Sequence, residues 1–101
     1  MKIRGPLFFW RGPAPWHFVK VPAKQCDELA AAAKLVSYGW GMVPVEVTIG
    51  KTSFTTSLWP KDGGYIVPIK TAARAAEGLE LGDVVTMTLR VAGRGILPRN
   101  A

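Results

Sequence analysis

The stretch Val67-Pro68-Ile69-Lys70 repeats an earlier one, Val21-Pro22-Ala23-Lys24, and this repetition decides the fold. Each copy is followed by an alanine-rich run, then by a glycine and a strand of alternating apolar residues, over 41–47 and 82–88. Neither β-α-β unit could bury its apolar face alone, whereas two related units can share one core. The sequence therefore predicts one barrel of two pseudo-symmetric β-α-β copies, mainly β with two short helices (α+β).

The two copies differ in the length of one loop. Their motifs are 67 − 21 = 46 residues apart, whereas the strands that follow, at Val43 and Val84, are 84 − 43 = 41 residues apart. The first copy therefore carries five more residues, because 46 − 41 = 5. Loops tolerate such insertions better than strands do, so we place them around 37–40.

Apolar residues alternate over 42–49, and Gly50-Lys51 predicts a two-residue hairpin turn with glycine first. This turn sets three inward cross-strand pairs: Ile49–Thr52, Val47–Phe54 and Val43–Leu58. The other predicted elements are strands over 3–10, 16–21, 65–69 and 84–91, and helices over 24–36 and 70–77.

Length and composition predict one domain. A chain of 101 residues with 49% hydrophobic residues can bury about two thirds of its unfolded surface around one core. We expect this domain to span 1–91. Residues 92–101 have no packing pattern, and we expect them to form a flexible tail.

Cysteine use and hydropathy indicate a cytoplasmic protein. Cys26 is the only cysteine, which excludes an intrachain disulfide. The apolar stretch over 7–10 is too short for a signal peptide, and no segment approaches the roughly 20 apolar residues that cross a bilayer. We therefore expect no membrane association.

Several spaced motifs resemble the bacterial family called domain of unknown function 1905. The resemblance covers about residues 3–91 and rests on Trp16-His17-Phe18-Val19, Gly39-Trp40-Gly41, Thr56-Ser57-Leu58, Gly64-Tyr65 and Glu77-Gly78-Leu79 with Gly82-Asp83. It implies a double-split β-barrel capped by helices, and it implies no established activity. The second copy is also distantly similar to the swapped-hairpin DNA-binding regulators of the AbrB type, in which two chains build the barrel.

The net charge of +6 is concentrated at the two ends of the chain. Residues 1–26 carry five basic and no acidic side chains, and residues 84–101 carry three basic side chains. If the first and last strands are neighbours, these ends merge into one basic face that attracts phosphate. The residues that we expect to contact nucleic acid are Lys20, Lys24, Lys70 and Arg74.

Aromatic residues suggest an alternative site. Three tryptophans lie beside glycine or proline near strand ends, where rings either fill the core or line a barrel mouth. In the second case a small-molecule pocket would be lined by Trp16, His17, Trp40, Trp59 and Tyr65.

Residues for other chemistry are scarce. His17 is the only histidine and has no partner motif for acid–base catalysis, and Cys26 lies on the apolar stripe of its helix. Gly50-Lys51-Thr52 lacks the upstream glycine and the following helix of a phosphate-binding loop. No ligand spacing favours a metal, so we expect no metal and no cofactor.

The sequence thus predicts a non-enzymatic binding module, with an enzymatic role left open. The favoured partner is nucleic acid or another anion, bound through phosphates with little sequence specificity. The alternatives are the tryptophan-lined pocket and a protein partner that docks on an exposed barrel edge. We expect a monomer or a weak homodimer.

Overall fold

The structure is a computed structural model that describes residues 1–11, 15–36 and 42–91. Its elements in chain order are β1 (Lys2–Arg11), β2 (Pro15–Lys20), α1 (Ala23–Val36), β3 (Val43–Ile49), β4 (Thr52–Lys61), β5 (Gly64–Pro68), α2 (Thr71–Glu77) and β6 (Val84–Val91). All the predicted strands and both helices are present, with bounds that differ by one or two residues. The predicted tail over 92–101 lies outside the described residues.

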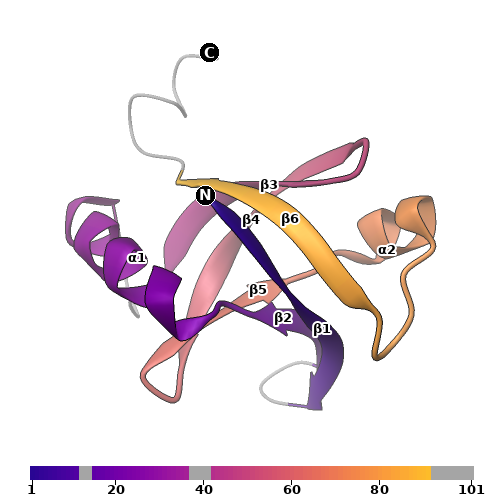
Figure 1. Cartoon of the computed structure of the whole chain (residues 1–101), viewed down its shortest axis with the longest axis horizontal. Coiled ribbons are helices and arrows are strands. Elements are labelled where there is room, and N and C mark those ends of the chain that lie inside the picture. Colours follow the sequence, from indigo (N-terminus) through magenta and orange to yellow (C-terminus); the bar gives the residue numbers. More distant parts are fainter. Residues whose placement is uncertain (12–14, 37–41, 92–101) are drawn as a thin grey trace.

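The strands form a closed barrel in the order β1-β2-β5-β4-β3-β6, and neighbouring strands are antiparallel. The first and last strands are neighbours, which meets the condition for the two basic ends to come together, and the amide of Leu89 in β6 donates to the carbonyl of Met1 at 2.7 Å. Figure 1 shows α1 and α2 at opposite sides of this barrel. The mainly β fold with two helices is therefore confirmed.

β1 pairs with a different strand in each half. Residues 2–6 pair with β6, and residues 7–11 pair with β2. The change falls just after Pro6, which has no amide hydrogen to donate. The amide of Leu7 then donates to the carbonyl of Asp83 at 2.8 Å. As a result, the far end of β1 forms a ribbon with β2.

The barrel interior is filled by one apolar cluster. Val43, Val45, Val47 and Ile49 are buried at alternate positions of β3, as the periodicity predicts. Further members come from the other strands, from α1 and from the residues that link β2 to α1 and β5 to α2: Ile3, Leu7, Val19, Val21, Leu29, Leu58, Val67, Ile69, Val85, Met87 and Leu89.

The β3–β4 hairpin has the predicted register. Ile49 pairs with Thr52, Val47 with Phe54 and Val43 with Leu58, and Gly50 adopts a φ of 58°. One expectation is wrong: Val47 is fully buried, but Phe54 is only half-buried and packs against the edge of the interior cluster. The reason is that β3 is flanked by β4 and β6 at Val47, whereas β4 pairs only with β3 at Phe54, because β5 reaches only residues 59–61.

The pairing pattern is the same for both halves of the chain. When β1, β2 and β3 exchange places with β4, β5 and β6, the same set of neighbouring strands results. An internal duplication would produce this symmetry. The superposition of the two halves and the double-split connectivity stay predictions.

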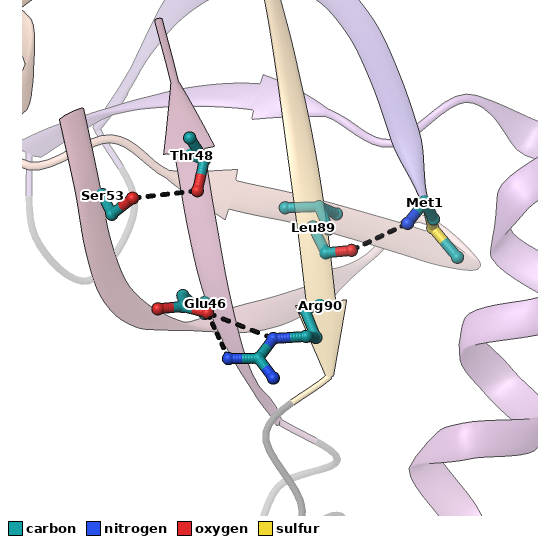
Figure 2. A network of polar contacts seen from close by, with 6 residues as sticks. All are labelled: Met1, Glu46, Thr48, Ser53, Leu89 and Arg90. Carbon is teal, nitrogen blue, oxygen red and sulfur yellow. Dashed lines mark hydrogen bonds and ion pairs between the residues drawn. The ribbon is translucent and has the colours of Figure 1, made fainter. Parts of the chain in front are cut away.

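Polar contacts reinforce the outer surface of β3 and its neighbours (Figure 2). The guanidinium of Arg90 donates to the carboxylate of Glu46 from Nε at 3.1 Å and from Nη2 at 2.5 Å. The hydroxyl groups of Thr48 and Ser53 are 2.9 Å apart across the hairpin. Arg90 thus belongs to an ion pair on this surface.

Glu77 at the end of α2 holds the helix against the β3–β4 turn. Its Oε2 accepts hydrogen bonds from Thr52 Oγ1 at 2.6 Å and from the amide of Lys51 at 3.3 Å. A Cβ atom on Gly50 would lie 2.3 Å from Glu77 Oε1. Glycine is therefore favoured at position 50 by its positive φ and by the close approach of Glu77, which any larger side chain would displace.

We predict that Gly50→Ala destabilises the domain more than Gly63→Ala. Both glycines have positive φ in hairpin turns, but nothing lies within 4 Å of a Cβ on Gly63. The strain common to both costs about 1 kcal/mol, and displacing Glu77 from Gly50 adds about 1 kcal/mol. Urea unfolding measures both.

The same comparison in a Glu77→Ala background is the control. In that background Gly50→Ala and Gly63→Ala should lower the free energy of unfolding by the same amount, because both the clash with Glu77 and the hydrogen bonds that Glu77 accepts are absent. Equal costs for the two glycine variants in the native background would contradict the assigned role of Glu77.

Candidate functional site: a basic cleft beside the second helix

A cleft of about 380 Å³ opens where β2 meets the start of α2. Its lining combines two β2 residues, one β4 residue and the segment that leads into α2: Trp16, His17, Thr56, Pro68, Ile69, Lys70, Thr71 and Arg74. A volume of this size is within the range of small-ligand sites.

The barrel register brings the two sides of the cleft together. Phe18 pairs with Pro68 and Val19 with Val67, so the beginning of β2 lies beside the end of β5. The amide of Ile69 donates to the carbonyl of His17 at 2.9 Å. This bond extends the strand pairing by one step and places Lys70 next to the aromatic end of β2.

The charge of the lining is basic. Lys70 and Arg74 contribute two cations, and none of the lining residues is a carboxylic acid. Arg74 Nη2 donates to Thr71 Oγ1 at 3.1 Å, whereas Arg74 Nε is buried and has no hydrogen-bond partner. An unpaired buried donor beside two positive charges suits an anionic acceptor.

His17 adds a neutral imidazole to the cleft. Its pKa is lowered from the ordinary value of 6.5, first because burial disfavours the charged ring and second because the Arg74 cation repels the added proton. At neutral pH the ring therefore carries one donor and one acceptor. Its other neighbour is the ring of Phe9, in an edge contact with centroids 5.2 Å apart.

An outer ring cluster stands behind the cleft and consists of Phe8, Trp10, Trp16, Phe18 and Trp59. Phe18 is fully buried, yet it points to the opposite side of β2 from the interior residue Val19. Trp16 packs on Trp59 with ring centroids 5.3 Å apart and remains 45% exposed. The cluster therefore fixes Trp16 while leaving part of its ring free.

The structure unites residues from two separate sequence hypotheses. Lys70 and Arg74 from the predicted nucleic-acid set share the cleft with Trp16 and His17 from the predicted pocket set. Trp59 contacts Trp16 from behind. Tyr65 packs against the interior cluster, and Trp40 lies outside the described residues.

Two predicted contacts with nucleic acid lie elsewhere. Lys20 lines a second cleft, at the start of α1. Lys24 lines a third cleft, which is next to the second because both include Arg4 and Pro22. The four cations thus line three clefts. Of the three C-terminal arginines in the predicted basic face, Arg90 is paired with Glu46, and Arg94 and Arg99 lie outside the described residues.

Sequence reasoning missed Thr56, Thr71 and Phe9. The hydroxyls of Thr56 and Thr71 line the cleft, and Phe9 lies beside His17. The sequence could have indicated the position of Phe9 beside His17 only if the β1–β2 register, in which the two residues pair, had been known. No group of three metal-ligating side chains occurs among the described residues, and none of the helices in the described part of the chain could span a membrane.

Comparison with protein families gives one match. The model described as Domain of unknown function (DUF1905) matches residues 4–89, which confirms the resemblance seen in the motifs. A search of curated proteins finds no match.

We predict that His17 makes the folded domain less stable in mild acid. Because its pKa is lower in the folded chain than in the unfolded chain, the unfolded chain takes up a proton first as the pH falls below about 6.5. The free energy of unfolding therefore decreases below that pH and is insensitive to this group above it. Urea unfolding of the native protein and of His17→Gln at about pH 7.5 and about pH 5.5 measures the effect.

The comparison between the native protein and His17→Gln removes the contribution of the carboxylates to the loss of stability, because these groups titrate equally in both proteins. The native domain should lose more stability than His17→Gln between these two pH values. Equal losses would show that the His17 environment does not favour the neutral ring.

Proposed function

The chain belongs to the family described as Domain of unknown function (DUF1905), and we propose that it is a binding module that holds an anionic small molecule in the cleft beside α2. The observation that carries this proposal is the buried, unpartnered Nε of Arg74 beside a cleft without carboxylates. A rotation of the guanidinium toward the cleft would expose this donor, and the ligand would supply the acceptor that it lacks.

The cleft also indicates what else the ligand carries. A bare phosphate would fill only a small part of about 380 Å³. Pro68, Ile69 and the half-exposed ring of Trp16 provide apolar surface next to the cations. A molecule with a flat ring and an attached phosphate or carboxylate satisfies both parts, since the ring stacks on Trp16 and the anion meets Arg74 and Lys70.

The other hypotheses from the sequence have less support. Phosphate binding by Lys20, Lys24, Lys70 and Arg74 as one face requires a surface that spans three clefts. Docking on an exposed barrel edge would use a segment that pairs on one side only, such as residues 52–58 of β4, and no buried side-chain atom without a partner marks that segment. The cleft beside α2 is therefore the candidate ligand site that the observations support best.

We predict that adenosine 5′-monophosphate (AMP) binds in this cleft. The probe combines a planar base with a phosphate, and a dissociation constant near 1 mM suffices for detection. An NMR titration should shift the amide signals of residues 16–17 and 69–74. Adenosine should bind more weakly than AMP, because it lacks the anion.

Two substitutions test the role of the cations. Arg74→Gln should weaken AMP binding about tenfold, because it removes a charge-assisted hydrogen bond at a buried atom. Lys70→Ala should weaken it by a smaller factor, since this ammonium is exposed. Lys51→Ala removes the same charge from an exposed turn and is the matched control.

The proposal is wrong if AMP and inorganic phosphate at about 10 mM shift no signal of the cleft. It is equally wrong if Lys24→Ala weakens AMP binding as much as Lys70→Ala does. That second outcome would favour binding by dispersed positive charge.

A further inference from the structure

We propose that the cleft beside α2 selects ligands that end in a phosphate monoester, and that His17 holds one of the phosphate oxygens together with Arg74 and Lys70. The inference rests on the proposed anion site and narrows its ligand to one kind of anion. A phosphate monoester has three strong acceptor oxygens and close to two negative charges at neutral pH. A carboxylate or a phosphodiester has two such oxygens and one charge.

The nitrogen donors of the cleft lining come from two elements that the barrel brings together. Lys70 and Arg74 come from the start of α2, and His17 comes from β2. The hydrogen bond from the Ile69 amide to the His17 carbonyl joins these two sides at 2.9 Å. An imidazole has one N–H even when it is neutral, so the lining offers a nitrogen donor for each of three oxygens.

Hydroxyl groups add to these donors. Thr71 Oγ1 accepts a hydrogen bond from Arg74 Nη2 at 3.1 Å, and this bond leaves the hydroxyl hydrogen of Thr71 to be donated. Thr56 contributes a second hydroxyl from β4. The lining is thus rich in donors and contains no carboxylate that would compete with the ligand for them.

The charged groups that face His17 from neighbouring elements are cations. Lys70 and Arg74 line the same cleft, and β4 supplies only a hydroxyl group to it. On β1, Arg11 lies on the same face as Phe9, which pairs with His17. A ligand with two negative charges therefore balances this group of cations better than a ligand with one.

The ring of His17 takes part in this balance. Burial and the Arg74 cation hold the pKa of His17 below its ordinary value of 6.5. A phosphate beside the ring offsets the Arg74 charge and gives the imidazolium an acceptor, and both effects raise the pKa of His17. The monoester is therefore bound more tightly when His17 carries a proton, because proton and ligand favour each other equally.

The imidazole is positioned before a ligand binds. The ring of Phe9 contacts it from β1, with centroids 5.2 Å apart and planes at 73°. On the other side of β2 the backbone of His17 is held by the Ile69 amide. Such restriction lowers the conformational entropy that the side chain loses when it binds the phosphate.

The test is an NMR titration with pH of the His17 ring signals in the full chain. His17 is the only histidine, so the assignment is unambiguous. AMP should raise the pKa of His17, and the methyl ester of the AMP phosphate, a diester with the same base and sugar, should raise it less. At about pH 7 AMP should bind about tenfold more tightly than this ester, because the ester lacks one charge-assisted hydrogen bond.

Three variants locate the effect. His17→Gln should lose most of the preference for AMP over its methyl ester, because the amide takes up no proton. Arg74→Gln should raise the pKa of His17 in the protein without AMP, because it removes the cation that repels the added proton. Lys51→Gln removes a cation from an exposed turn and should change neither the preference nor the response of His17.

The outcomes separate this inference from the proposed function. If AMP shifts the amide signals of the cleft but leaves the pKa of His17 unchanged, the inference is wrong and the anion site stands. Equal affinity for AMP and its methyl ester, or an undiminished preference in His17→Gln, would also overturn it. If AMP shifts no signal of the cleft, the proposed function and this inference both fall.

Discussion

The pairing of β2 with β5 is the constraint on which the rest of the site depends. It places the first residues of β2 beside the last residues of β5, and the hydrogen bond from the Ile69 amide to the His17 carbonyl fixes that arrangement at 2.9 Å. Because α2 starts directly after β5, its basic side chains must lie next to the aromatic end of β2. Closure of the barrel thus builds the cleft without any loop that is dedicated to it.

The clefts at the starts of α1 and α2 differ chemically at positions that the symmetric strand pairing relates. The two helices begin 48 residues apart, since 71 − 23 = 48, and the bond from the Ile69 amide to the His17 carbonyl has its counterpart at this offset in the bond from the Val21 amide to the Tyr65 carbonyl. At this offset Trp16 corresponds to Gly64, His17 to Tyr65 and Arg74 to Cys26. The cleft at the start of α1 includes Asp62 and Gly63 and a second carboxylate, Asp27. The ring of Trp16 and the cations of Lys70 and Arg74 without a carboxylate beside them therefore occur at the cleft beside α2 and not at the cleft at the start of α1.

Much of the fold was predictable, but most of the site was not. The alternation over 42–49 and the Gly50-Lys51 turn predicted the β3–β4 register, because a two-residue turn allows only one pairing. The meeting of His17 with Arg74 depends on β2–β5 pairing between strands far apart in sequence, for which no local pattern exists. The burial of Phe18 outside the barrel was equally hidden, because an alternating strand does not tell which face a second layer of rings will cover.

The most direct measurement is a crystal structure of the domain with AMP bound. The account predicts a phosphate oxygen within about 3 Å of Arg74 Nε and the base against the free part of the Trp16 ring. It also predicts that the backbone around His17 and Ile69 stays in place, because the strand pairing already sets the cleft. A phosphate beside Lys20 or Lys24 at the start of α1, with Arg74 Nε still unpartnered, would contradict it.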